Sequence, residues 1–315
     1  MRFPADRQLL LLLTLLALLG VELVRAQKGA QWSGALQMPR GFAGFGGDGQ
    51  GDDMQSALHP RLRSPLLPQH DAPEFYFTRI TYTENGRRSR RTMRKPDTAY
   101  VCPEFGGGAY FPQQGWGWAT DYPGADCKFM GGVERLTGVR VSPNPNVISI
   151  LDEKLFDFPF VYAVEVGGME LSTAEAERLR EYLLRGGFLH VDDFWGGHQK
   201  DNFETQMRKV FPDRPIERLS LNHPAFHTYY DITEVMQMPN RSNGCWGGET
   251  WEQSDDTEPA ILGISNSTGR LMVVATYNSD MGDAWEYMDL PCYPTKFSSQ
   301  AYRVGIGFMI YAMSH

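Results

Sequence analysis

The chain of 315 residues lacks several features that would assign it to a common class of protein. It has no C-x-x-C pair, so its cysteines do not suggest a zinc knuckle. It has neither the G-x-S-x-G of a serine hydrolase nor the H-E-x-x-H of a zinc protease. It also lacks an excess of basic residues, since its net charge is −8, and binding phosphates requires a basic face. Nucleic acid is therefore not an expected partner.

Long apolar runs are also scarce, and the clearest one lies at the N-terminus. Two arginines precede the apolar run Leu9–Leu19, and Val24–Ala26 offers small residues at the positions that a signal peptidase recognises. The run is about half of the ~20 residues that a membrane-spanning helix needs. We therefore expect residues 1–26 to be a signal peptide, cleaved before Gln27. Because no later segment resembles a transmembrane helix, the mature protein is expected in the periplasm or outside the cell.

The cysteine content is low but even, with four residues in the whole chain. In an exported protein, four cysteines can form two disulfides in three possible pairings. Proximity in the sequence favours Cys102 with Cys127 and Cys245 with Cys292.

Composition divides the chain after the signal peptide into two parts. Residues 27–72 are rich in glycine and then proline, have little apolar periodicity, and are predicted to be a disordered tether. Residues 73–315 have the patterning of a folded domain.

Early in this domain, the basic run Arg87–Lys95 is expected to be a solvated loop, or else to contact an anionic polymer. The aromatic and glycine-rich segment Tyr100–Trp118 follows as a candidate binding loop or lid.

The clearest structural pattern lies in Leu171–Trp195 and predicts a helix, a turn and a buried strand. Ser172 and Glu175 have the spacing of a capping box, and the glycines at 186 and 187 end the helix. The strand Phe188–Val191 is apolar without alternation, as expected in a parallel sheet covered on both faces. In such sheets, ligands bind at the carboxyl ends of the strands.

The same alternation of strands and helices continues through the domain. Further strands are predicted at residues 75–83, 147–151 and 160–166, and a hairpin at 261–265 and 271–277. Helices are predicted after Asp126, over residues 203–210 and over 301–313. This order indicates an α/β domain with a mostly parallel sheet.

Several of these segments carry a family resemblance. They are Phe77–Tyr82, Asp121-Tyr-Pro with Asp126, Leu155–Tyr162, Leu179–Phe194, His223-Pro224, Gly269–Leu271, Tyr277-Asn278 with Asp280, and Ala301–Arg303. Through these segments, the chain resembles the bacterial domain-of-unknown-function family DUF4159, which is itself similar to the class I glutamine amidotransferase-like superfamily. The resemblance implies a flavodoxin-like, three-layer α/β/α domain in a family with no established activity. Amidotransferases of this superfamily use a cysteine on a tight turn after a central strand. Acids and aromatics occupy that position here, so Cys-His chemistry is not expected.

The candidate site residues lie mostly at the predicted strand ends. The candidates for catalysis are Asp192, Asp193 and His223, and those for a divalent metal are Asp192, Asp193 and Asp280. The candidates for ligand binding are Asp121, Asp126, Trp195, Asn278 and Arg303. Simpler interpretations are available for some of them. Asp126 has the position of a helix cap, a single histidine is more often structural, and adjacent aspartates on a strand point to opposite faces.

Two hypotheses follow from these residues. The first is an exported, non-catalytic module of the bacterial cell envelope that binds an envelope polymer, a saccharide or an envelope protein. The alternative is a hydrolase or sugar-modifying enzyme in which Asp192, Asp193, His223 and Asp280 converge above the sheet, with or without a divalent metal. The sequence identifies neither the ligand nor the oligomeric state, nor which of the adjacent aspartates faces a cleft.

Overall fold

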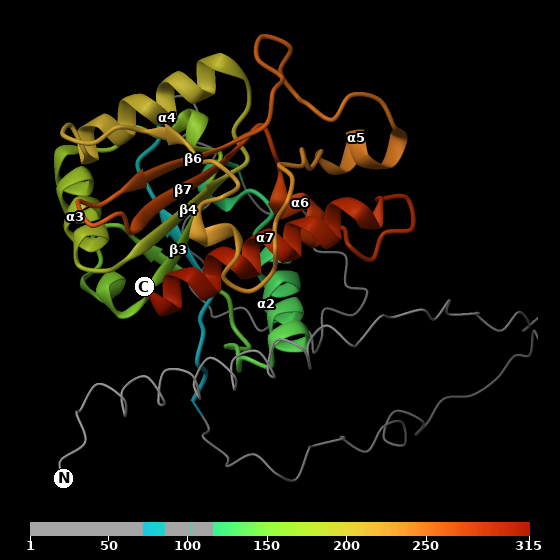
Figure 1. The fold of residues 1–315 in the computed structure, drawn as a ribbon, viewed down its shortest axis with the longest axis horizontal. Helices are drawn as coiled ribbons and strands as arrows, with labels where there is room; N and C mark the ends of the chain where they lie inside the picture. Colours follow the sequence, from blue (N-terminus) through green and yellow to red (C-terminus); the bar gives the residue numbers. More distant parts are fainter. Residues whose placement is uncertain (1–71, 86–101, 103–115) are drawn as a thin grey trace, which may run out of the picture. The chain divides into compact units, whose positions relative to one another are not determined.

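A seven-stranded sheet forms the centre of the domain in the computed structural model, which describes residues 72–85, 102 and 116–315 (Figure 1). The strands are β1 (Thr78–Thr81), β2 (Asn146–Ser149), β3 (Phe160–Val164), β4 (Phe188–Asp192), β5 (Glu217–Arg218), β6 (Ala260–Ser265) and β7 (Leu271–Tyr277). Their order across the sheet is β2-β1-β3-β4-β7-β6-β5. The described residues all fall in one unit, 68–315.

Five neighbouring strands of this sheet are parallel, and two at one edge are not. β2, β1, β3, β4 and β7 run in the same direction, β6 is antiparallel to β7, and β5 is antiparallel to β6. From β1 the chain goes first to β2 on one side and then to β3 on the other. Such a reversal of strand order is where open α/β sheets commonly bind ligands. The predicted α/β class with a mostly parallel sheet is confirmed.

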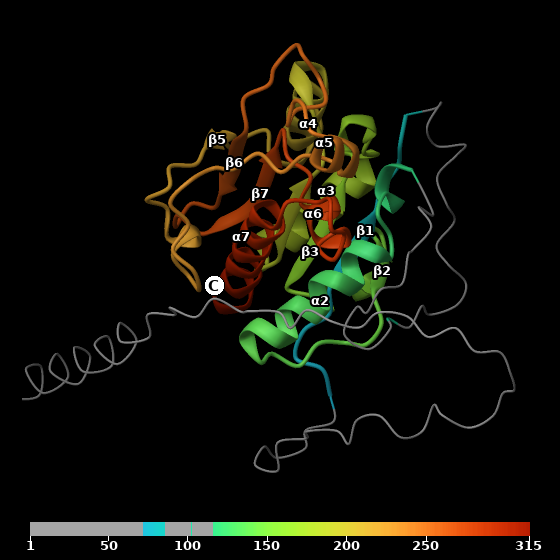
Figure 2. The same ribbon diagram turned by 90° about the vertical axis from the view of Figure 1, so that its right-hand side faces the viewer.

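Helices cover both faces of the sheet, as Figures 1 and 2 show. The helices of the described residues are α2 (Gly124–Thr137), α3 (Thr173–Leu184), α4 (Gly196–Val210), α5 (Arg241–Trp246), α6 (Met281–Glu286) and α7 (Thr295–Ser314), with short 3-10 helices η2 (Gly117–Ala119), η3 (Glu153–Asp157), η4 (Val166–Gly168) and η5 (Pro224–Phe226). Along β3, Val161 and Ala163 pack with α3 and α4, whereas Phe160, Tyr162 and Val164 pack with α2, α6 and α7. This alternation produces the three layers.

The pattern predicted around the central strand is confirmed. Ser172 and Glu175 form the capping box at the start of α3. After the helix, Gly186 adopts a φ of 116°, a conformation that a residue with a Cβ rarely reaches. β4 then begins at Phe188, is buried along its whole length, and lies between two parallel neighbours, β3 and β7. Its carboxyl end, at Asp192, therefore lies in the middle of the sheet edge.

The hairpin of β6 and β7 is also confirmed, but the edge strand β5 was not predicted. β5 contains only Glu217 and Arg218, both exposed, so it leaves no apolar signal in the sequence. Helix α7 begins at Thr295, six residues before the predicted start at Ala301. Its first turns were not predicted because they are more polar than the rest of the helix. These differences leave the arrangement of the parallel strands unchanged.

Both predicted disulfides are present, joining Cys102 to Cys127 and Cys245 to Cys292. Within the part of the chain that the structure describes, no helix is long and apolar enough to cross a bilayer. The predicted signal peptide, residues 27–71 of the predicted tether, the basic run Arg87–Lys95 and most of the segment Tyr100–Trp118 lie outside the described residues.

Candidate functional site

Each of three adjacent parallel strands is followed by a polar residue whose backbone conformation is unusual. Glu165 after β3, Asp193 after β4 and Asn278 after β7 have φ values of 56°, 53° and 54°. Residues other than glycine are uncommon in this left-handed region, although Asn and Asp tolerate it best. The turns are joined by backbone hydrogen bonds from Glu165 N to Asp193 O (3.0 Å) and from Asp193 N to Ser279 O (3.1 Å). The carboxyl edge of the sheet is therefore a linked set of strained turns bearing polar side chains.

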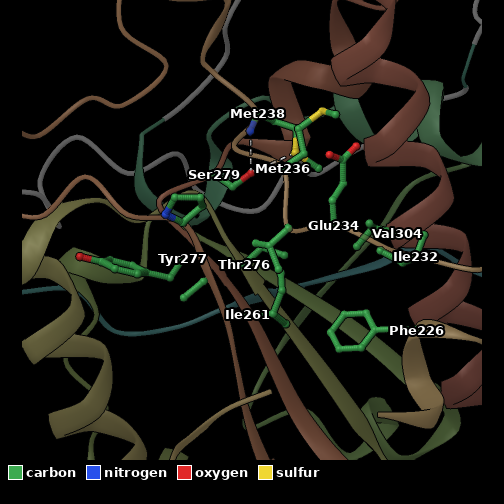
Figure 3. A pocket seen from close by; sticks show the side chains of 13 residues that line it. Phe226, Ile232, Glu234, Met236, Met238, Ile261, Thr276, Tyr277, Ser279 and Val304 are labelled. Carbon is green, nitrogen blue, oxygen red and sulfur yellow. Dashed lines mark hydrogen bonds between the residues drawn. The ribbon is translucent and has the colours of Figure 1, made fainter. Parts of the chain in front are cut away.

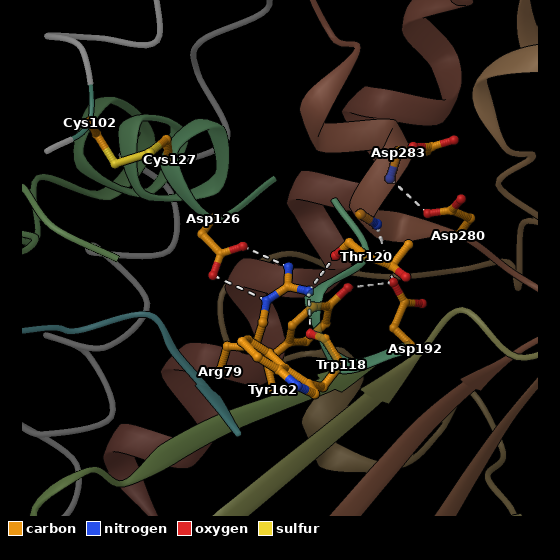
Figure 4. Close-up of polar contacts among 11 residues, drawn as sticks. Arg79, Cys102, Trp118, Thr120, Asp126, Cys127, Tyr162, Asp192, Asp280 and Asp283 are labelled. Atoms are coloured by element: carbon orange, nitrogen blue, oxygen red, sulfur yellow. Dashed lines mark hydrogen bonds and ion pairs between the residues drawn. A yellow bond between two sulfur atoms is a disulfide. The ribbon is translucent and has the colours of Figure 1, made fainter. Parts of the chain in front are cut away.

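Asp192, the last residue of β4, is a fully satisfied hydrogen-bond acceptor (Figure 4). Its carboxylate accepts hydrogen bonds from the hydroxyls of Tyr162 and Thr276 and from the backbone amides of Met281 and Gly282. Burial raises the pKa of Asp192 to about 6, although all four of these hydrogen bonds favour the ionised form. Asp192 thus holds the start of α6 against β4 and β7.

Asp193 follows directly but has different surroundings. Its Oδ1 accepts a hydrogen bond from Trp195 Nε1 at 2.8 Å. One carboxylate oxygen each from Asp193, Asp121 and Asp280 lie within 4.8 Å of one another. Burial and the nearby acids raise the pKa of Asp193 well above its usual range. The left-handed turn has taken Asp193 out of the strand, so strand alternation no longer separates it from the acids near Asp192.

A second group of acids shares one member with the first. Asp121, Asp283 and Glu286 also bring carboxylate oxygens within 4.8 Å of one another. All three side chains are at least nine-tenths buried, with exposed fractions of 2%, 6% and 8%. Burial, followed by the charges of neighbouring acids, raises the pKa of Glu286 to about 8, and burial raises that of Asp283 to about 6. Five buried carboxyl groups from Asp121, Asp193, Asp280, Asp283 and Glu286 thus form an acidic cluster beside α6.

Two of the predicted ligand-binding residues have structural roles. Asp126 forms a buried ion pair with Arg79, at 2.6 Å between Oδ2 and Nη2. The side chain of Asn278 is fully buried; its Oδ1 accepts a hydrogen bond from Gly196 N, and its Nδ2 donates to the carbonyls of Asp256 and Glu258. Both side chains therefore have their hydrogen-bonding capacity committed to the fold.

Two other candidates lie away from the acidic cluster. Arg303 is exposed on α7, where it donates to the carbonyl of Asp231. The ring of His223 lies 6.2 Å from that of Tyr311, whose hydroxyl accepts a hydrogen bond from Leu271 N at the first residue of β7. Asp280 comes after the other end of β7, so His223 is separated from the acids by roughly 20 Å, the length of the seven-residue strand at ~3.3 Å per residue. The expected convergence of His223 with the aspartates does not occur.

A polar cavity of about 430 Å³ opens beside Trp195, at the same edge of the sheet. It is lined by Asn85, Gly167, Gly168, Trp195, His198, Gln199, Gln253, Ser254 and Asp255. These residues come from the turn after β3, from the start of α4, from the segment before β6 and, for Asn85, from the segment after β1. Apart from Trp195, none of them was predicted from the sequence. The rule that ligands bind beyond the carboxyl ends of strands could have identified His198 and Gln199, which closely follow β4, but only the fold places Gln253 and Asp255 opposite them.

A different, apolar cavity between α7 and strands β6 and β7 is too small for an organic ligand (Figure 3). Its volume is about 10 Å³, and its lining includes Phe226, Ile261 and Val304. That space is at the lower limit for one water molecule. The cavity beside Trp195 and the acidic cluster are therefore the stronger candidates for function.

The chain matches a protein family over most of its folded domain. The model of a family described as a domain of unknown function, DUF4159, matches residues 109–313. This range contains all five acids of the cluster and most of the residues that line the polar cavity. No curated protein matches the chain.

Proposed function

The chain belongs to the DUF4159 family of domains of unknown function, and we propose that it is an exported module that binds a hydroxyl-rich ligand without transforming it. The observation that carries the proposal is the polar cavity of about 430 Å³ beside Trp195. Its position, beyond the carboxyl ends of β3 and β4, is the usual place for a ligand in an open α/β sheet.

The chemistry of the cavity suits a saccharide or another component of the bacterial cell envelope. The side-chain amides of Asn85 and Gln253 can each donate and accept hydrogen bonds, as can the imidazole of His198. A sugar hydroxyl also donates and accepts, so such groups can pair with it in either direction. Asp255 adds an acceptor whose Oδ2 is fixed by the backbone amide of Gly197, at 2.9 Å.

Three observations favour binding over catalysis. Asp193 occupies the turn after β4, where an amidotransferase would carry its cysteine, and its Oδ1 is bonded to the indole of Trp195. All four cysteines are paired in disulfides. His223, the base that the alternative hydrolase would use with Asp192, Asp193 and Asp280, lies at the other end of β7. The order of the five parallel strands supports the resemblance to flavodoxin-like domains, but a shared fold alone carries no activity.

Export is the other part of the proposal. The signal-like residues 1–26 and the two disulfides both support an oxidising compartment, the periplasm or the extracellular space. Protein recovered from the native host is expected to begin at Gln27 by N-terminal sequencing. Recovery of a mature chain that retains residues 1–26 would contradict the proposed export.

The ligand proposal is tested by isothermal titration calorimetry with soluble cell-wall glycan fragments. We expect His198→Ala and Gln253→Ala each to weaken binding at least tenfold, because each removes a group that lines the cavity. Asp201→Ala is the matched control, since Asp201 is exposed on the same helix α4 but does not line the cavity. The proposal fails if no glycan binds, or if binding is unchanged by both cavity variants. Release of cleaved glycan by the wild type would instead support the hydrolase.

A further inference from the structure

We propose that Asp121, Asp283 and Glu286 form a binding site for one divalent cation, for which Ca²⁺ is the best fit. The three carboxylates come from two places in the chain. Asp121 lies in the turn before α2, and Asp283 and Glu286 lie one turn apart on α6. Oxygens of the three side chains all lie within 4.8 Å of one another.

Buried oxygens without partners point to a ligand at this position. Asp121 Oδ2, Asp283 Oδ1 and Glu286 Oε2 are all buried, and no hydrogen-bond donor from the described residues reaches any of them. Buried carboxylate oxygens are normally satisfied by a donor or by a metal ion. Three such oxygens in three neighbouring side chains are explained together by one cation.

The surrounding structure anchors one of these carboxylates and packs the backbone closely against the other two. Asp283 Oδ2 accepts a hydrogen bond from Arg241 N at 2.6 Å. A Cβ added to Gly282 would lie 2.5 Å from Asp121 Oδ2, and one added to Gly124 would lie 2.4 Å from Glu286 Oε1. Both glycines therefore allow the backbone to approach the acids closely. Such anchoring of one oxygen, with the other left for the ion, is common around bound metals.

The cationic side chains nearby do not neutralise the group. Arg79 is the described cation whose charge acts on both Asp121 and Glu286, yet its guanidinium donates to Asp126 and to the carbonyls of Trp118 and Thr120. Arg241 contributes its backbone amide, while its guanidinium lies over the ring of Tyr287. Each positive side chain is thus engaged elsewhere, and a bound ion would supply the missing positive charge.

The donor set identifies the class of cation. Three carboxylates without histidine or cysteine are typical of sites for hard cations such as Ca²⁺ and Mg²⁺, and not of Zn²⁺ sites. Two oxygens on opposite sides of Ca²⁺ are about 4.6–5.2 Å apart, whereas around Mg²⁺ they are about 4.0–4.2 Å apart. Oxygens that lie within 4.8 Å of one another are compatible with either ion. Ca²⁺ accepts irregular geometry, whereas Mg²⁺ requires a nearly ideal octahedron, so ligands from two separate segments suit Ca²⁺ better.

The neighbouring acids Asp193 and Asp280 are weaker candidates for the same ion. Asp193 Oδ1 is bonded to Trp195 Nε1, and Asp280 Oδ1 accepts the amide of Asp283 as the N-cap of α6. Neither has a buried oxygen that lacks a partner. We therefore assign the ion to the group of Asp121, Asp283 and Glu286, where Asp193 and Asp280 add negative potential.

The experiment uses the full mature protein, first stripped with EDTA, then titrated with CaCl₂ in a calorimeter and in thermal unfolding. We expect one Ca²⁺ to bind per chain and the melting temperature to rise with Ca²⁺ until the site is saturated. The rise should be smaller with Mg²⁺, and Zn²⁺ should not bind more tightly than Ca²⁺. Glu286→Gln should weaken Ca²⁺ binding at least tenfold, and so should Asp283→Asn, which serves as a second variant if the first folds poorly. Glu177→Gln, an exposed acid on α3, is the matched control and should bind like the wild type.

Two results would overturn the assignment. If none of the three ions shifts the melting temperature, the acids are held neutral by protons and the group binds no metal. If Asp193→Asn abolishes Ca²⁺ binding while Glu286→Gln and Asp283→Asn retain it, the ion belongs to the other group of acids. Both readouts are made without any glycan, so failure here is distinguishable from failure of the proposed ligand binding.

Discussion

The guanidinium of Arg79 donates to both carboxylate oxygens of Asp126, at 3.3 and 2.6 Å, and neither side chain is exposed to solvent. This pair joins the first strand, β1, to the first full turn of α2 (Figure 4). The backbone carbonyls of Trp118 and Thr120 accept the remaining hydrogen bonds of Arg79. Asp126 was a candidate ligand-binding residue, and its complete pairing with Arg79 instead indicates a structural role.

Breaking this buried pair should destabilise the domain strongly. Asp126→Ala leaves the charge of Arg79 buried without a partner, which typically costs about 3–5 kcal/mol. Urea unfolding should therefore show a much lower midpoint, with Asp213→Ala as the control. Asp213 pairs with Arg180 at the surface, where solvent screens the charges and such a pair contributes little to stability. Similar losses in both variants would contradict the role assigned to Asp126.

The adjacent acids Asp192 and Asp193 should respond differently to the same substitution. Asp192→Asn replaces an acceptor of four hydrogen bonds with a group that has only one oxygen, and we expect a loss of about 1–3 kcal/mol. Asp193→Asn relieves repulsion among buried acids and retains a residue that tolerates a φ of 53°, so the metal-free protein should be no less stable. Urea unfolding in EDTA measures both, and equal destabilisation would show that Asp193 is structural too.

Asp192 and the acidic cluster should together make the stability of the metal-free protein fall as pH rises. Burial raises the pKa of Asp192 and Asp283 to about 6 and that of Glu286 to about 8, so the folded state retains protons that the unfolded chain has already lost. This contribution is complete below about pH 4 and disappears as pH rises through 6 and 8. Each proton retained only by the folded state contributes about 1.4 kcal/mol per pH unit.

His190 has the opposite effect, because it makes the stability of the folded state rise with pH, but only at lower pH. Burial lowers its pKa to about 3, so the unfolded chain takes up a proton below about pH 6.5 that the folded state refuses. The decline in stability should therefore be clearest between pH 6.5 and 8, where His190 no longer contributes. Urea unfolding in EDTA across this range provides the measurement, and saturating Ca²⁺ should flatten the profile. Stability that rises between pH 6.5 and 8 in EDTA would mean that the cluster is ionised without cost.

The two disulfides should leave no thiol available in the native protein. Thiol titration is expected to find none before reduction and four after reduction in denaturant, because all four cysteines are paired. Removing either bridge by a double Cys→Ser substitution should cost about 2–4 kcal/mol. The variant lacking Cys102 and Cys127 and the variant lacking Cys245 and Cys292 serve as controls for each other. A reactive thiol in the native wild type would contradict both pairings.

Local sequence patterns predicted much of the architecture. The capping box of Ser172 and Glu175, the glycines after α3 and the unalternating strand Phe188–Val191 depend on interactions within a few residues. Such interactions can be recognised from spacing alone, and they correctly placed Asp192 and Asp193 at the carboxyl end of a buried strand. β5 escaped prediction because its two residues are exposed and have no apolar pattern.

The composition of the candidate site was decided by the tertiary structure. The sequence singled out Asp193 and Asp280, but it could not bring Asp121 into contact with Asp283 and Glu286, more than 150 positions further along the chain. It also made His223 a candidate for catalysis, whereas the fold places this residue at the other end of β7. Strand alternation could not decide which of Asp192 and Asp193 faces a cleft, because the left-handed turn at Asp193 depends on backbone contacts with Glu165 and Ser279. Local propensities determine which elements form, and contacts between distant segments determine which of their side chains meet.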